Sequence, residues 1–150
     1  MLYFLLVHPH IIYCLSAWGG TSKSTLKPIV TLQKKIIRII THSPFNSPSA
    51  PIFTKLNILS FDQQYELNLS ILMHKIYNNN TTGTYNLTLT NKIHNINTRS
   101  SKNQNYYQKF NKLNIGLNSF ITNGIKVWNK IPINKKTNRY IFSKNKLSSI

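Results

Sequence analysis

The chain has 150 residues, of which 41% are hydrophobic, a length that fits one compact domain with a real core and excludes a multidomain enzyme. Nineteen Lys and Arg residues stand against only two acidic residues, Asp62 and Glu66, which gives a formal net charge of +17 and a sequence pI of about 10.2. This imbalance indicates a polyanionic partner, and we expect RNA or DNA. A codon bias toward Lys, Asn and Ile would add lysines but would not remove carboxylates. An anionic lipid surface remains an alternative.

The cysteine content does not fit a disulfide-bonded or zinc-bound protein. Cys14 is the only cysteine, which excludes a disulfide framework and a multi-cysteine zinc site within this chain and favours an intracellular protein, nuclear or cytoplasmic. On a helix His10 and Cys14 would point to one side, but no paired ligands complete a metal site around them. We predict no metal and no cofactor in this chain.

Residues 1–17 are apolar enough to suggest a membrane anchor. A spanning helix needs about twenty predominantly apolar residues. Here His8, Pro9 and His10 interrupt the run, and no basic segment precedes it. We expect no stable membrane insertion, and a small membrane-associated protein anchored by residues 1–17 is the alternative from another functional class.

Two helices are predicted within residues 1–40. The first covers residues 1–18, is kinked at Pro9 and ends at the following glycine pair. The second begins after Ser24 or Thr25, which places Pro28 in its first turn. Apolar residues at helical spacing define the face of the second helix that we expect in the core: Ile29, Leu32, Ile36, Ile39 and Ile40.

A proline-rich loop at 42–51 separates these helices from the next two. A short helix is predicted over 52–59. Ser60 and Gln63 then form a capping box that opens a longer helix ending near Tyr77. The apolar stripe of that helix is Phe61, Tyr65, Leu69, Leu72, Met73 and Ile76.

The composition changes after residue 80, where Asn, Lys, Thr and Tyr dominate. Residues 85–93 alternate well enough to predict a short strand, and residues 119–132 predict a final amphipathic helix. We therefore expect a mostly α protein: a bundle of three to four helices at 1–80, a basic, loosely structured Asn-rich linker at 81–116, and a C-terminal amphipathic helix with a basic tail at 117–150. The residues expected in the core are Tyr13, Trp18, Ile36, Tyr65, Leu69, Leu72 and Trp128.

Catalysis by this chain alone is not expected. Two-metal phosphoryl transfer needs carboxylates that hold divalent ions about 4 Å apart. The only acidic side chains, Asp62 and Glu66, are better explained by the dipole at the start of the predicted helix. A Cys14 nucleophile would need a base and an orienting acid, and the acid is missing. The sequence predicts a binding protein, not an enzyme.

Two basic segments are candidates for nucleic-acid binding. In LQKKIIRII the cations share a helix with isoleucines, so one side can contact phosphates while another packs; a solvated helix face is the alternative. In NTRSSKNQNYYQK, residues 97–109, cations are mixed with Tyr106 and Tyr107, a pattern that can combine phosphate contacts with base stacking or form a disordered basic loop. The predicted binding residues are Lys27, Lys34, Lys35, Arg38, Arg99, Lys102 and Lys109.

Four stretches together resemble one protein family: LYFLLVHPHIIYCLSAWGG, LQKKIIRIITHSPFNSPSAPIFTKLNIL, NTRSS and GIKVWNKIP. In order and spacing they resemble the region after the polymerase palm, the thumb or connector, in reverse transcriptases of non-LTR retrotransposons of the jockey and CR1-like kind. The resemblance covers nearly the whole chain. Three residues depart from the family pattern: Cys14 replaces a glycine, Ile96 an aromatic residue, and Ile131 a leucine.

The resemblance implies a C-terminal fragment of an RNA-directed DNA polymerase that holds template RNA and primer DNA through phosphates. The implied partners are RNA, DNA and the missing polymerase palm of the parent protein, to which any divalent metal would belong. The palm aspartates and the endonuclease of the family have no counterpart in this sequence, so no polymerase activity is implied for the chain alone. An inert or repurposed nucleic-acid-binding relic is the alternative. A helix that packs on an absent palm would expose Leu2, Leu5 and Leu6.

Overall fold

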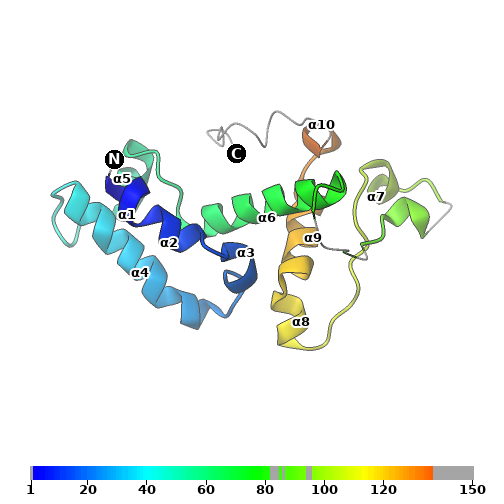
Figure 1. The fold of residues 1–150 in the computed structure, drawn as a ribbon, viewed down its shortest axis with the longest axis horizontal. Coiled ribbons are helices and arrows are strands. Elements are labelled where there is room, and N and C mark those ends of the chain that lie inside the picture. Colours follow the sequence, from blue (N-terminus) through cyan, green and yellow to red (C-terminus); the bar gives the residue numbers. More distant parts are fainter. Residues whose placement is uncertain (1, 82–84, 86, 94–95, 137–150) are drawn as a thin grey trace. The chain divides into compact units, whose positions relative to one another are not determined.

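The computed structural model describes residues 2–81, 85, 87–93 and 96–136 (Figure 1). It is mostly helical, as predicted, and among these residues the β pairing is limited to an isolated antiparallel bridge between Leu89 and Tyr106. The chain divides into two compact units, Met1–Asn68 (unit 1) and Leu69–Ile150 (unit 2). This division falls inside a helix, whereas the composition of the sequence changes only after residue 80.

The N-terminal apolar segment forms three short helices, α1 (Leu2–Leu6), α2 (His8–Ile12) and α3 (Leu15–Trp18), and not the single kinked helix that was predicted. α1 and α2 separate at Val7, two residues before Pro9, because the proline has no N–H to donate to the preceding turn. Within the described part of the chain, no helix has the length and apolar character needed to cross a membrane.

A second break between helices lies at Cys14, and no feature of the sequence predicted it. Cys14 takes a left-handed φ of 50°, which residues other than glycine seldom adopt. Trp18 Nε1 donates to Tyr13 O at 2.7 Å across this break. The Tyr13 side chain is 77% exposed beside the break, so the prediction that Tyr13 belongs to the core is wrong.

α4 (Lys23–Ile40) is the long helix of unit 1 and begins earlier than predicted. Its N-cap is Ser22, whose Oγ accepts from Thr25 N at 3.4 Å, and Pro28 therefore lies inside the helix beyond the first turn. In Figure 1 α1 lies beside α4, and the two helices are in contact.

The buried face of α4 is rotated relative to the predicted stripe. Gln33 and Ile37 are its buried residues, and Ile36 is half-buried against the same core. Leu32 and Ile39, both predicted in the core, are 55% and 72% exposed. The prediction for these two was wrong because a glutamine occupies the centre of the buried face, where a pattern of apolar residues cannot reveal it.

Two apolar clusters hold unit 1 together. One contains Tyr3, Ile37, Ile52 and Ile58, and joins α1 and α4 to α5 (Ser49–Lys55) and the segment after it. The other contains Ile11, Leu15 and Phe61, with Trp18 and Tyr65 packed against it. Burial of these side chains removes apolar surface from water, which is the main stabilising contribution.

Gln33 links three parts of unit 1 by hydrogen bonds. Its Nε2 donates to Tyr3 OH at 2.8 Å and to Leu59 O at 3.1 Å, and its Oε1 accepts from Phe61 N at 3.1 Å. Phe61 is the first residue of helix α6 (Phe61–Tyr77), so Gln33 satisfies a backbone N–H that has no partner inside α6.

α6 (Phe61–Tyr77) confirms the predicted helix and half of its capping box, in which Ser60 N donates to Gln63 Oε1 at 3.0 Å. Leu69 is fully buried, and Leu72 is half-buried against the core of unit 2. Both residues were expected in the core.

Four helices end in a left-handed turn that glycine usually forms. The residue after each C-cap has a positive φ between 50° and 56° in α4, α5, α6 and α7 (Arg99–Lys102), and these residues are His42, Asn57, Asn79 and Gln104. In α4, Ser43 N donates to Arg38 O at 2.9 Å and His42 N to Ile39 O at 3.1 Å, the two bonds of a Schellman motif. The turns satisfy carbonyls at the helix ends and direct the chain out of each helix.

Unit 2 has its core around Trp128 of α9 (Phe120–Lys130), which is fully buried as predicted. Met73, Ile76, Tyr106 and Ile125 complete the buried cluster. Among the described residues of 85–93 the predicted strand is not formed: Leu89 makes the single bridge, and Thr90–Lys92 form a 3₁₀ turn, η1. Two short helices, α8 (Asn114–Asn118) and α10 (Ile133–Lys136), flank α9 in the chain, and the predicted tail beyond residue 136 lies outside the described residues.

Candidate nucleic-acid interface

The first predicted basic segment lies on the solvent side of α4. Lys27, Lys34 and Lys35 are exposed, and Arg38 is half-buried. Spacings of seven and four residues return to nearly the same side of a helix, so Lys27, Lys34 and Arg38 share one face. The exposure of the three lysines allows them to reach a phosphate backbone.

Arg38 is held in place by the loop that follows α4. Its Nε donates to Ser47 O at 3.0 Å. A guanidinium has five N–H donors in a planar fork, and this bond uses the one on Nε. The four donors on the two Nη atoms are those that match a phosphate in a bidentate contact. The side chain is therefore oriented before any ligand arrives.

The end of α4 forms a cavity of about 380 Å³. It is lined by Lys35, Arg38, Ile39, His42, Ser43 and Phe45. Ile39 and Phe45 are both 72% exposed, so the cavity combines cations with apolar and aromatic surface open to solvent. We call these six residues the α4-end site.

The sequence predicted only two residues of the α4-end site, Lys35 and Arg38. His42 and Phe45 fall in the segment 42–51, for which the sequence predicts a loop between helices, and the Schellman turn at His42 brings that segment back beside the helix. An exposed aromatic residue close to a basic helix was the available signal, because bases stack on such rings.

In unit 2 the predicted residues separate into two groups. Arg99 and Lys102 are exposed on α7, which contacts η1. Lys109 is exposed on the extended segment after Tyr106 and lines a pocket together with Tyr107. Tyr107 is 48% exposed, which is compatible with the predicted stacking.

Tyr106 does not fit the predicted stacking role. It is buried, with its ring centroid 6.0 Å from that of Trp128, and burial raises its pKa to about 12 with a smaller effect of Tyr77. Asn129 pairs with both of its backbone groups: Tyr106 N donates to Asn129 Oδ1, and Asn129 Nδ2 donates to Tyr106 O, each at 3.0 Å. Tyr106 is a core residue that fixes this segment.

Lys136 is a buried cation and belongs to the core, not to the surface. Its Nζ donates to Asn103 O at 2.8 Å and to Asn105 Oδ1 at 2.7 Å, and lies 5.3 Å from the centroid of the Trp128 ring. Burial lowers the pKa of Lys136 to about 8. Its ammonium group is therefore not available to a phosphate.

Charge is distributed unequally between the two units. Thirteen of the nineteen Lys and Arg residues lie in the sequence of unit 2, and both acidic residues, Asp62 and Glu66, lie in unit 1. Unit 2 thus has no carboxylate side chain to neutralise its cations. Such a surface attracts anions over its whole extent.

Among the residues that the structure describes, no group of three His, Cys, Asp or Glu side chains could hold a metal ion.

The comparisons with known proteins do not assign the chain to a family. No family model, curated protein or solved structure matches the chain.

Proposed function

We propose that this chain binds nucleic acid through its phosphate groups and that the cationic face of α4 with the α4-end site is a principal contact. The observation that carries this proposal is the arrangement of Lys35, Arg38 and Phe45 around one cavity of about 380 Å³. Phosphates require cations, and unstacked bases or sugars require apolar or aromatic surface next to them.

The binding mechanism is positioning by charge. Lys27, Lys34 and Lys35 supply point charges along α4, and Arg38 supplies a fork held by its bond to Ser47. Arg38, in the last turn of α4, also stabilises the negative end of the helix dipole, so it needs no acidic partner in the free protein. Contacts to phosphates carry no base information, and we expect affinity with little sequence preference.

The resemblance to the post-palm region of non-LTR reverse transcriptases supports template RNA or primer DNA as the ligand. In this proposal the chain positions the nucleic acid for a polymerase palm and performs no chemical step of its own. A repurposed nucleic-acid-binding relic would use the same surface.

Salt dependence of binding tests the proposal. If six to ten phosphates are neutralised, the affinity for RNA or DNA should fall roughly 10³- to 10⁵-fold between about 50 and 200 mM salt. Filter binding of the purified chain to a labelled oligonucleotide across this range measures the slope. A nearly flat response, or no binding in dilute buffer by a folded chain, would refute phosphate binding.

A further inference from the structure

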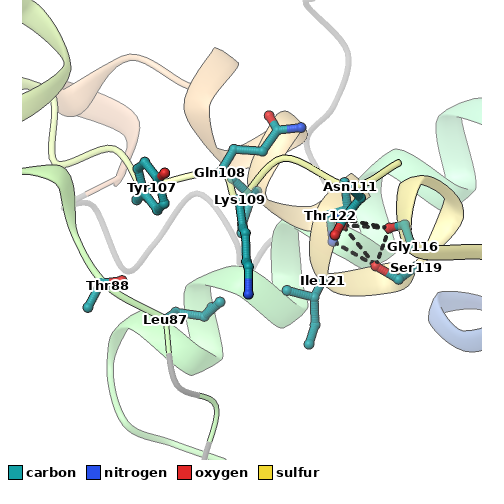
Figure 2. A pocket seen from close by; sticks show the side chains of 11 residues that line it. Leu87, Thr88, Tyr107, Gln108, Lys109, Asn111, Gly116, Ser119, Ile121 and Thr122 are labelled. Carbon is teal, nitrogen blue, oxygen red and sulfur yellow. Dashed lines mark hydrogen bonds between the residues drawn. The ribbon is translucent and has the colours of Figure 1, made fainter. Parts of the chain in front are cut away.

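Unit 2 contains a pocket of about 420 Å³ that phosphate binding by α4 does not use. Figure 2 shows its polar corner, where Asn111, Ser119 and Thr122 surround the Gly116 carbonyl. Thr122 Oγ1 donates to Gly116 O at 2.8 Å, and Ser119 Oγ to the same oxygen at 2.9 Å. Apolar side chains of Leu87, Ile121 and Ile125 line the rest of the pocket.

The opposite wall comes from the extended segment that follows Tyr106. Tyr107 N donates to Thr88 O at 2.9 Å, which fixes this segment beside residues 87–89. Successive side chains of an extended chain point to opposite sides. Because Tyr106 is in the core, Tyr107 and Lys109 fall on the other side and line the pocket.

Figure 2 shows how these side chains lie. Lys109 extends from the segment toward Leu87 and Ile121. The Tyr107 ring stands at the end of the pocket opposite the polar corner. An aromatic ring, an apolar wall and one flexible cation thus border the same space.

We propose that this pocket binds one nucleotide, with the base packed between Tyr107 and the apolar wall and its phosphate contacted by Lys109. The volume falls within the range of small-ligand pockets, about 300–1,000 Å³. Unit 2 has no acidic side chain, which favours an anionic ligand over a cationic one. A nucleotide carries a phosphate that Lys109 can bind and a flat aromatic base that can stack on the Tyr107 ring.

The nucleotide can come from two sources: an unstacked residue of a single strand or a free mononucleotide. The first source rests on the proposed function and extends it, since a strand that is bound through its phosphates also carries the bases that this pocket would take. The second source is independent of it. The two are separated by comparing an oligonucleotide with the corresponding monophosphate.

The test measures the full chain by fluorescence anisotropy against two labelled strands of about twelve nucleotides, an oligothymidylate and an abasic strand with the same phosphates. Stacking is worth about 1–3 kcal/mol per base, which corresponds to about 5- to 150-fold tighter binding of the strand that carries bases. Tyr107→Ala should bring this ratio close to one, and Tyr107→Phe should keep it. Tyr13→Ala removes an exposed tyrosine from unit 1 and is the control.

Lys109→Ala should weaken binding of both strands by a similar factor, and Lys126→Ala, an exposed lysine that does not line the pocket, should have a smaller effect. Tyr107→Leu keeps apolar volume without the ring and replaces Tyr107→Ala if far-UV circular dichroism shows that the alanine variant is unfolded. Binding of thymidine monophosphate that depends on Tyr107 identifies a free nucleotide as the source; binding of the strand alone identifies the strand.

The outcomes for the two proposals are distinct. Equal binding of the two strands by the wild-type chain, or a ratio that Tyr107→Ala leaves unchanged, overturns the nucleotide pocket if thymidine monophosphate also shows no binding that depends on Tyr107, and it leaves phosphate binding intact. Failure to bind either strand overturns phosphate binding, and if thymidine monophosphate is also not bound, the pocket proposal fails with it.

Discussion

Gln33 Nε2 donates a hydrogen bond of 2.8 Å to the hydroxyl of Tyr3, thirty residues away, and both side chains are buried. Burial raises the pKa of Tyr3, and the hydrogen bond from Gln33 acts in the opposite direction. Gln33→Leu would leave Tyr3 OH, Leu59 O and Phe61 N without this partner. We expect the free energy of unfolding to fall by about 3 kcal/mol, because an unsatisfied buried group costs about 1–3 kcal/mol.

Urea denaturation followed by circular dichroism measures this loss. Gln63→Ala is the control, since it removes two exposed bonds, from Ser60 N and Ser60 Oγ, at the start of α6 and should cost only about 1 kcal/mol. The loss of unfolding free energy in Tyr3→Phe should lie between the losses in these two variants. Equal midpoints for Gln33→Leu and the wild type would show that these bonds do not stabilise unit 1.

Gly19 is required by a close approach of two helices. A Cβ at this position would lie 2.5 Å from Tyr65 Cδ2 and 2.6 Å from Leu15 O. The Leu15 carbonyl is backbone and cannot move aside, so Gly19→Ala should lower the stability by about 1–3 kcal/mol. Gly124→Ala is the comparison, because its nearest contact would be the flexible Met73 side chain, at 2.8 Å from Sδ. A thermal melt of each variant should show the larger drop for Gly19→Ala.

Lys136 should make the stability of the chain rise with pH. Burial lowers its pKa from 10.5 to about 8, so between these values the unfolded chain binds more protons than the folded chain, and stability increases as pH rises. The increase should be about 2 kcal/mol at most between pH 7 and 9.5. Above pH 10 the trend reverses, because the pKa of Tyr106 is raised to about 12 and the unfolded tyrosine ionises first.

Urea midpoints of the wild type and of Lys136→Gln over pH 7–9.5 test this expectation. The variant keeps a hydrogen-bond donor for Asn103 O and Asn105 Oδ1 but carries no titrating group. Its midpoint should be nearly constant over this range. A wild-type profile as flat as that of the variant would contradict a lowered pKa.

Lys34 and Arg38 of α4 should each contribute more to nucleic-acid binding than a cation of unit 1 that lies outside this helix. Lys34→Ala combined with Arg38→Ala should reduce the slope of log affinity against log salt by about 2, one unit for each phosphate contact. Lys55→Ala is the control, because it removes one charge from an exposed position of α5. A slope change in Lys55→Ala as large as half of that in the double variant would show that the position of the cations on α4 is unimportant.

The exposed leucines of α1 should promote self-association of the isolated chain. Leu2, Leu5 and Leu6 are 63%, 73% and 63% exposed, so replacing one of them removes no buried contact of unit 1. Leu5→Gln should leave the unfolding midpoint within about 0.5 kcal/mol of wild type and reduce light scattering at high concentration. Tyr3→Gln, which replaces the buried neighbour, should instead destabilise the fold.

The helical class and α6 could be predicted because local signals agree there. Ser60 and Gln63 mark the start, and the stripe from Phe61 to Ile76 repeats at helical spacing over the whole helix. Trp18 and Tyr65 were both expected in the core. They are half-buried against the apolar cluster of unit 1 that contains Ile11, Leu15 and Phe61.

The break at Cys14 and the turns at His42 and Gln104 could not be predicted, because each places a residue with a side chain in a conformation that sequence rules reserve for glycine, or at times asparagine. Only two of the six residues of the α4-end site could be predicted, for the same reason, since the turn at His42 is what places Phe45 beside Arg38. A polar residue at the centre of a buried face, as Gln33 is, likewise escapes a pattern built on apolar residues.

The lack of any acidic side chain after Glu66 gives the second half of the molecule the character of a polyelectrolyte. Its lysines cannot be compensated by salt bridges to side chains of the same half, so small counter-ions from the solvent must screen their mutual repulsion. Multivalent anions concentrate on such a surface more strongly than chloride does. The conformational stability of this half therefore depends on the salt in solution. A bound phosphate backbone would screen the repulsion between its lysines and so stabilise its folded structure.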